Sequence, residues 1–135
     1  YYVHYLPSII LLSHMKKELS KYLVTGILAV GTDYVSYVLL LHVLSHSPAK
    51  AISYIFGMVV AFVLNRYWTF QSTNKAHHDA FKFTIVYMSS LLLNVLTNKL
   101  ALFILPSFVT FCFLVATGVS VVTNYIGQKF WVYRK

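Results

Sequence analysis

The sequence predicts an all-α integral membrane protein with four transmembrane helices, built from two parallel helical-hairpin repeats. The chain has 135 residues, of which 59% are hydrophobic and only 10% are charged, whereas soluble domains carry about 25% charged residues. The basic residues stand at the ends of long apolar runs. A third observation is that the basic and aromatic pattern that closes one such run occurs again near the C-terminus.

The first fourteen residues contain no Lys, Arg, Asp or Glu. Pro7 is expected to break any helix there, and the apolar part is too short to cross a bilayer. No cationic residues precede it, so it is a poor signal peptide. Since Met15-Lys16-Lys17 resembles a natural bacterial start, we interpret residues 1–15 as an extension: an expression remnant, an over-called start or an interfacial segment.

Four spans of roughly 20 residues are expected, at about 22–43, 49–67, 83–105 and 108–130 within the membrane domain 16–135. Pro48 suits the start of the second helix, Pro106-Ser107 allows only a tight reversal, and polar residues 71–79 form the loop between the halves. Only fifteen residues separate Lys50 from Arg66. Both cations must therefore extend toward the headgroups, or the bilayer must thin.

The distribution of basic residues predicts the orientation. Nine of the eleven Lys and Arg residues fall in three flanks that share one side of a four-span protein. By the positive-inside rule, both termini are expected in the cytoplasm, with the protein in the cytoplasmic (inner) membrane. These residues are Lys16, Lys17 and Lys21; Arg66, Lys75 and Lys82; and Lys129, Arg134 and Lys135.

The two halves are related by a repeat of 61 to 63 residues. The corresponding positions are Lys21-Tyr22 and Lys82-Phe83, Asp33 and Asn94, and Arg66-x-Trp68 and Lys129-x-Trp131. A membrane interface favours such a cation beside aromatic rings, because the rings sit at headgroup level and the cation reaches lipid phosphate. Trp68 and Trp131 are expected to serve first as interfacial anchors.

Asp33 lies twelve residues beyond Lys21, which at about 1.5 Å rise per residue places it near the middle of the membrane. A carboxylate there costs about 2.5–3.5 kcal/mol on insertion scales. We therefore expect it to face the bundle interior and to have a partner or a task. Binding of substrate or of a proton is preferred over a neutral Asp that only joins helices.

The spans also contain amide side chains and small residues that could have either of two roles. Amides can bind hydroxyl groups or join helices, and both roles stay open for Asn94 and Asn124. Asn98 is interpreted as structural, and Lys99 as reaching the outer interface. Two ladders of residues spaced by four are assigned to helix packing first: Gly57, Ala61 and Asn65, and Ala116, Ser120 and Asn124.

Catalytic chemistry has little support. His42 and His46 are four residues apart and could share a metal, but no Cys or nearby carboxylate completes a site. Only three acidic residues are present, the single Cys112 excludes an internal disulfide, and no phosphate-binding loop, dinucleotide turn or Ser/His/Asp arrangement occurs. We expect no enzyme activity, metal, cofactor or nucleic-acid partner.

Three blocks carry a resemblance to a known family. They are Lys21 to Tyr34, Ala61 to Phe70, and Asn124 to Tyr133. Together they resemble the GtrA-like family of small four-span bacterial membrane proteins. Lys129 stands where that family commonly has Arg, which keeps the charge but loses bidentate phosphate geometry. Tyr133 replaces the usual Phe.

The resemblance implies a role in cell-surface polysaccharide synthesis: moving a polyprenyl-phosphate-linked sugar, such as undecaprenyl-phosphate glucose, to the outer leaflet for a separate glycosyltransferase. Arg66 and Lys129 could then hold the phosphate. Asn65 adjoins Arg66, while Asp33, Asn94 and Asn124 could surround the sugar, on which Trp68 and Trp131 could also stack.

Two other functions stay open. A proton-coupled transporter of the small multidrug-resistance type would use one carboxylate in its first span, although interfacial Arg66 and Lys129 suit an anion better than a cation. A non-transporting scaffold for a membrane glycosyltransferase is the other. Because four helices form a thin wall for a glycolipid path, a homodimer is expected.

Overall fold

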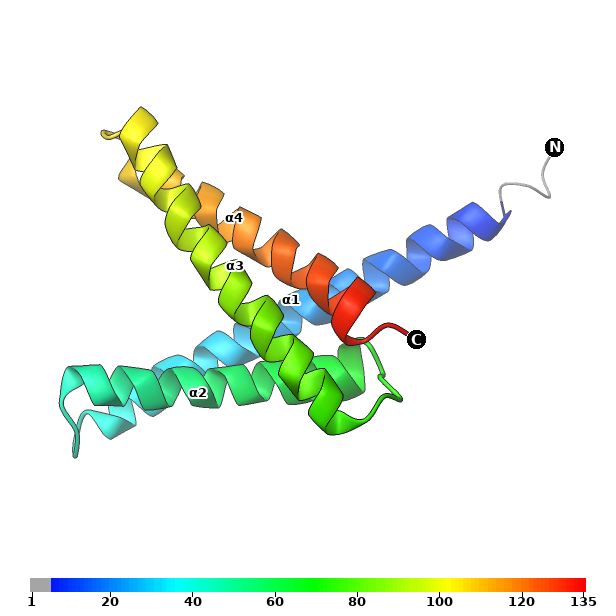
Figure 1. The fold of residues 1–135 in the computed structure, drawn as a ribbon, viewed down its shortest axis with the longest axis horizontal. Coiled ribbons are helices and arrows are strands. Elements are labelled where there is room, and N and C mark those ends of the chain that lie inside the picture. The colour runs from blue at the N-terminus through cyan, green and yellow to red at the C-terminus, as the bar shows by residue number, and fades with distance from the viewer. Residues whose placement is uncertain (1–5) are drawn as a thin grey trace. The chain divides into compact units, whose positions relative to one another are not determined.

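The computed structural model describes residues 6–135; residues 1–5, and the side chains of Leu6, Ser47 and Lys50, lie outside the described part. The chain forms four α-helices, two of which continue into short π-helical segments (Figure 1). All four helices are long and apolar enough to cross a membrane, so the all-α four-span prediction is confirmed. The elements are α1 (Leu6–Leu40), α2 (His46–Leu64) with η1 (Asn65–Thr69), α3 (Ala76–Ile104), and α4 (Val109–Gly127) with η2 (Gln128–Val132).

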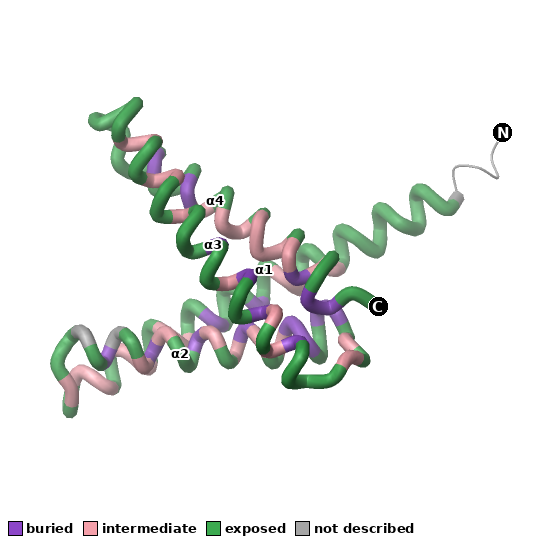
Figure 2. Tube along the Cα trace, viewed as in Figure 1, coloured by how far each residue is buried: buried purple, intermediate pink, exposed green. Residues whose placement is uncertain are grey.

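The chain divides into two compact units, the first ending at Gln71 and the second beginning at Ser72. Each unit is a helical hairpin: α1 packs against α2 in the first, and α3 against α4 in the second (Figure 1). Buried residues are concentrated where paired helices face each other, and most outward side chains are exposed (Figure 2). Among these, Ile27 is 72% exposed and Phe103 is 86% exposed, as expected for surfaces that face lipid.

The start of α1 corrects one prediction. The helix begins at Leu6 and continues without a break to Leu40, so the expectation that Pro7 breaks any helix before residue 15 is wrong. Pro7 lies in the first turn, where a backbone N–H would have no acceptor within the helix. The same helix ends three residues before the expected Val43, in a turn over residues 41–43.

The loop between the hairpins is shorter than expected. Residues 71–79 were predicted to form this loop, but α3 begins at Ala76 with Lys75 as its N-terminal cap. The sequence His77-His78-Asp79 is therefore part of the first turn of α3. Asp79 is the acidic residue of this first turn.

Small residues allow the helices of each hairpin to approach closely, as the two ladders predicted. In the first hairpin, a Cβ atom at Gly57 would lie 2.8 Å from the backbone oxygen of Ala29. At the corresponding place in the second hairpin, Ser90 Oγ donates to the Ser120 backbone oxygen at 2.9 Å, and Ser120 Oγ donates to the Ser90 oxygen at 3.3 Å. The repeat seen in the sequence therefore extends to the helix contacts.

A second pair of equivalent contacts lies nearer the open end of each hairpin. In the first, the hydroxyl oxygens of Thr25 and Thr69 are 3.3 Å apart. The equivalent residues of the second are Val86 and Val132, and both are buried. The two hairpins thus share one backbone arrangement but fill it with different side chains.

Candidate functional site

Both α2 and α4 end in a π-helical segment. The Phe70 N–H donates to the Asn65 oxygen at 2.8 Å, and the Tyr133 N–H donates to the Gln128 oxygen at 2.9 Å. This widened backbone geometry often occurs at functional sites. It coincides with the two basic and aromatic blocks, so each block is a distinct structural element and not merely the end of an α-helix.

The tryptophan of each segment is held by a lysine from the first helix of the same hairpin. Lys21 Nζ lies 5.5 Å from the centre of the Trp68 ring and donates to the Trp68 oxygen at 3.3 Å. Lys82 Nζ lies 5.8 Å from the centre of the Trp131 ring and donates to the Trp131 oxygen at 3.5 Å.

Both indole rings remain accessible, with Trp68 40% and Trp131 44% exposed. A positive charge and an accessible ring therefore lie together at the open end of each hairpin. Neither Lys21 nor Lys82 was predicted to have a role in the site. Lys21 and Lys82 occupy equivalent positions in the repeat, and this equivalence could have indicated a role in the site.

The two cations predicted to hold phosphate differ in their surroundings. Arg66 is only 7% exposed, and its Cζ lies 5.2 Å from the centre of the Tyr67 ring. Lys129 is half-buried, with Nζ 3.3 Å from the Tyr125 hydroxyl and 5.8 Å from the centre of the Phe130 ring. Each lies in the π-helical segment of its own hairpin, and their convergence on one phosphate stays a prediction.

Asp33 faces α2 inside the first hairpin. Ser53 Oγ donates to Asp33 Oδ1 at 2.7 Å, an ordinary distance for a hydroxyl hydrogen bond. Ser53 is completely buried. Gly57, one turn further along α2, comes so close that its added Cβ would lie 3.1 Å from Asp33 Cβ. The expectation that Asp33 has a partner is confirmed, although Ser53 was not predicted. Its orientation toward the interior of the whole bundle stays a prediction.

Comparison with known families identifies a family of transmembrane domains. Residues 21–133 match the family described as GtrA/DPMS, transmembrane domain. The chain belongs to this family. It is a multi-pass membrane protein of polysaccharide or glycolipid synthesis. No solved structure matches the chain.

Within this GtrA/DPMS domain, the predicted amides are distributed over both hairpins. Asn65 is 2% exposed in η1, and Asn94 and Asn98 are half-buried on α3. Asn124 is half-buried on α4, and its Oδ1 atom has no hydrogen-bond partner among residues 6–135. Asn94 occupies the position equivalent to Asp33, and Ala116 the position equivalent to Ser53, so the second hairpin lacks the carboxylate and hydroxyl of the first.

The GtrA/DPMS domain also contains a buried acidic cluster that corrects a prediction. Asp79 was expected to lie in a solvated loop, but it is 1% exposed. Its Oδ2 accepts a hydrogen bond from Ser72 Oγ at 2.7 Å, and its Oδ1 accepts one from Asn74 Nδ2 at 3.2 Å. Asn74 Nδ2 also lies 3.4 Å from the Val132 oxygen and 3.2 Å from the Arg134 oxygen. This group, which we call the Asp79 clasp, joins the loop, the first turn of α3 and the C-terminal segment.

The histidines of the first hairpin do not form the pair that their spacing suggested. His42 lies in the turn after α1, while His46 begins α2. His46 Nδ1 is 2.8 Å from the Tyr37 hydroxyl, and His42 Nδ1 is 3.1 Å from the Val38 oxygen. Residues at this spacing on one helix could have shared a metal, but these two lie on different elements.

Proposed function

We propose that this protein translocates a polyprenyl-phosphate-linked sugar, such as undecaprenyl-phosphate glucose, across the cytoplasmic membrane for modification of a cell-surface polysaccharide. The observation that carries the proposal is the Asp33–Ser53 pair inside a hairpin of membrane-spanning length. A carboxylate in such a place is costly and usually functional. Membership in the GtrA/DPMS family supports the same class of pathway.

The geometry of Asp33 suits recognition of hydroxyl groups. An ionised carboxylate accepts up to about four hydrogen bonds. The 2.7 Å bond from Ser53 orients the Asp33 carboxyl group, and in this proposal that group recognises a sugar hydroxyl. Asn94 and Asn124 offer amide groups on the second hairpin, and the Oδ1 atom of Asn124 supplies a further acceptor.

The phosphate of the carrier would bind where cations and rings meet. Lys21 beside Trp68 and Lys82 beside Trp131 form such sites at the open ends of the two hairpins. A partly desolvated ammonium or guanidinium group binds phosphate through charge-assisted hydrogen bonds. In this proposal Lys129 contributes from the half-buried position it occupies, while Arg66 mainly sets the positive potential, because it is only 7% exposed.

The isoprenoid tail would stay in lipid along the exposed apolar helix faces. Both termini and the basic ends would face the cytoplasm, in agreement with the positive-inside rule. Three acidic residues in the whole chain provide too few groups for general acid–base chemistry, so we assign transport and not catalysis. A homodimer would supply a longer protein wall, and a separate membrane glycosyltransferase would use the delivered sugar.

The test uses purified full-length protein in liposomes that contain a labelled polyprenyl-phosphate sugar. Oxidation by impermeant periodate measures how fast the sugar changes leaflet. We expect Asp33→Asn to abolish the movement and Ser53→Ala to slow it several-fold. Thr32→Ala is the matched control, because Thr32 Oγ1 donates only locally, to the Leu28 oxygen at 2.9 Å, and should leave the rate unchanged.

Three outcomes would contradict the proposal. Unchanged transport by a folded Asp33→Asn variant would make Asp33 structural. Asp33-dependent efflux of organic cations would favour a transporter of the small multidrug-resistance type. If the protein moves no sugar lipid but co-purifies with a glycosyltransferase and activates it, a scaffold role would replace translocation.

A further inference from the structure

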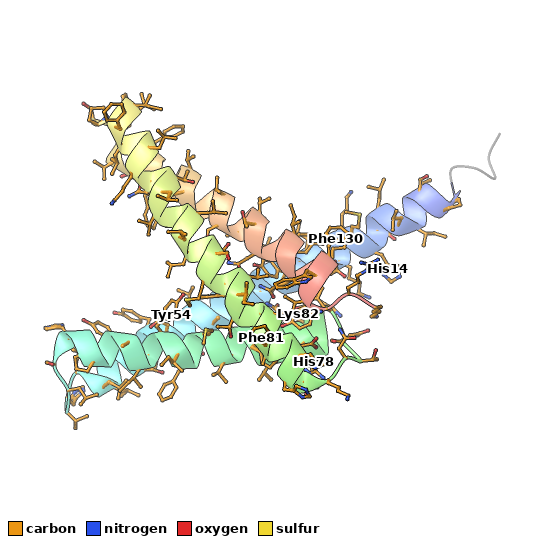
Figure 3. All side chains as sticks on the ribbon, in the orientation of Figure 1. His14, Tyr54, His78, Phe81, Lys82 and Phe130 are labelled. Carbon is orange, nitrogen blue, oxygen red and sulfur yellow. The ribbon has the colours of Figure 1, made fainter. Side chains whose placement is uncertain are left out.

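The second hairpin contains a basic pocket that extends beyond the Lys82–Trp131 contact of the proposed function and includes cations that it does not use. A cavity of about 590 Å³ lies among the loop before α3, the first turns of α3 and the C-terminal segment. Figure 3 shows two of its lining residues, His78 and Lys82, on α3. Four cations line it: Lys75, Lys82, Arg134 and Lys135.

The single acidic residue in the lining does not cancel this charge at the surface. Asp79 is 1% exposed, and its two oxygens accept hydrogen bonds from Ser72 and Asn74. Four formal positive charges therefore surround one carboxylate that is buried beneath them. A ligand that enters this pocket meets a positive potential.

Fixed contacts hold the walls of the pocket. The Asp79 clasp fastens the C-terminal segment through Asn74 Nδ2, which lies 3.2 Å from the Arg134 oxygen. On the other wall, Lys82 is held over the exposed ring of Trp131. Cations from three separate segments are thus brought together by hydrogen bonds around the buried Asp79 carboxylate and by a ring contact, which differs from a chance cluster on one flexible tail.

The repeat shows that the charges of Arg134 and Lys135 have no counterpart in the first hairpin. Gln71 and Ser72 occupy the positions after η1 that correspond to Arg134 and Lys135 after η2. The first copy has neutral residues there, although its π-helical segment and its lysine–tryptophan contact are the same. An interfacial anchor alone would not account for this difference.

We propose that this pocket, formed by Lys75, Lys82, Arg134, Lys135 and Trp131, binds a phosphate group. An arginine can bind phosphate through two hydrogen bonds, the lysines add point charges, and the indole ring covers an attached headgroup. The phosphate comes either from the headgroup of an anionic lipid or from a soluble phosphate compound. The pocket shares Lys82 and Trp131 with the phosphate site of the proposed function and rests on it to that extent. Phosphate binding here does not require translocation, so the two proposals can fail separately.

The decisive variant is Arg134→Gln with Lys135→Gln. Both side chains are exposed, and the Asp79 clasp uses only the backbone oxygen of Arg134, so the fold should be retained. The matched control is Lys16→Gln with Lys17→Gln on α1, which removes the same two charges from exposed positions outside the pocket. Circular dichroism verifies that both variants remain helical.

Two arms distinguish the sources of phosphate. In the first, inorganic phosphate is titrated calorimetrically into the full-length protein in an uncharged detergent. In the second, the protein is placed in phosphatidylcholine nanodiscs with added phosphatidylglycerol, and native mass spectrometry counts the retained anionic lipid. We expect the pocket variant to bind roughly tenfold more weakly than the parent in at least one arm and the control variant to bind like the parent.

Each outcome of the two arms either supports or overturns the proposal. Loss in the first arm indicates a pocket open to soluble phosphate, and loss in the second alone indicates a lipid headgroup; either supports the proposal. An equal reduction in the pocket and control variants would show general attraction to a basic protein and would overturn it. Absence of binding by the parent in both arms would also overturn it.

Discussion

Replacement of Gly57 by Ala is expected to disturb both the packing and the candidate site of the first hairpin. The new Cβ atom would lie 2.8 Å from the Ala29 oxygen and 3.1 Å from Asp33 Cβ. The nearer obstacle is a backbone atom, which cannot rotate away. The helices must separate by several tenths of an ångström, and the turn that carries Asp33 must move with them.

The expected change in unfolding free energy for Gly57→Ala follows from two opposing effects. Inserting a methyl group into a tightly packed contact costs about 1–3 kcal/mol, while Ala stabilises a helix by roughly 0.5–1 kcal/mol relative to Gly. Gly26 and Gly31 on α1 isolate the second effect, since a Cβ atom at either would meet nothing within 4 Å. The difference in unfolding free energy between Gly57→Ala and Gly26→Ala should therefore equal the packing cost, about 1–3 kcal/mol.

A buried thiol can report this difference in the hairpin concerned. Cys112 is completely buried in the second hairpin, and the equivalent residue of the first hairpin, Ala49, is completely buried as well. Cys112→Ala combined with Ala49→Cys moves the only thiol of the chain into the first hairpin. A thiol-reactive dye then measures the midpoint of thermal unfolding in detergent, which Gly57→Ala should lower by several degrees relative to Gly26→Ala.

Equal midpoints for the two variants would refute this account of the α1–α2 contact. Transport provides an independent readout, because Gly57→Ala displaces Asp33 from Ser53 and Gly26→Ala does not. If Gly57→Ala moved the sugar lipid as fast as the parent, the close approach at this position would have no role in shaping the site.

Two further predictions concern the second hairpin, where Cys112 is the natural reporter. A Cβ atom at Gly127 would lie 2.7 Å from Val86 Cγ1, so Gly127→Ala should lower the midpoint, and the added change Val86→Ala should restore most of the loss. Failure of that rescue would refute the steric explanation. Asp79→Ala should destabilise this hairpin by about 1–3 kcal/mol, because it leaves the half-buried donors Ser72 and Asn74 without their buried acceptor; an unchanged midpoint would mean that water replaces the carboxylate without cost.

The four spans could be predicted because they depend on composition and length, which the sequence states directly. The depth of Asp33, taken from about 1.5 Å per residue beyond Lys21, stays a prediction. Pro7 was misjudged because the effect of proline depends on where the helix begins: it breaks an interior and suits a first turn. Sequence patterns locate such boundaries poorly.

The Asp79 clasp could not be predicted, for a different reason. Its bonds to the Val132 and Arg134 oxygens join residues 58 and 60 positions apart, and backbone acceptors leave no trace in residue types. A polar run containing Ser72, Asn74 and Asp79 has the composition of a solvated loop. Only the folded hairpin shows that these residues satisfy one another. The π-helical segments were missed similarly, since they depend on a shift in backbone hydrogen bonding.

The two hairpins carry different polar side chains at equivalent positions of the repeat. Where the first has Asp33 held by Ser53, the second has Asn94 and Ala116; where the first continues with Gln71 and Ser72, the second ends in two cations. Both hairpins nevertheless keep a close helix contact at the equivalent positions Gly57 and Ser120. The Asp33–Ser53 pair therefore belongs to the first hairpin alone, and the basic pocket to the second hairpin alone.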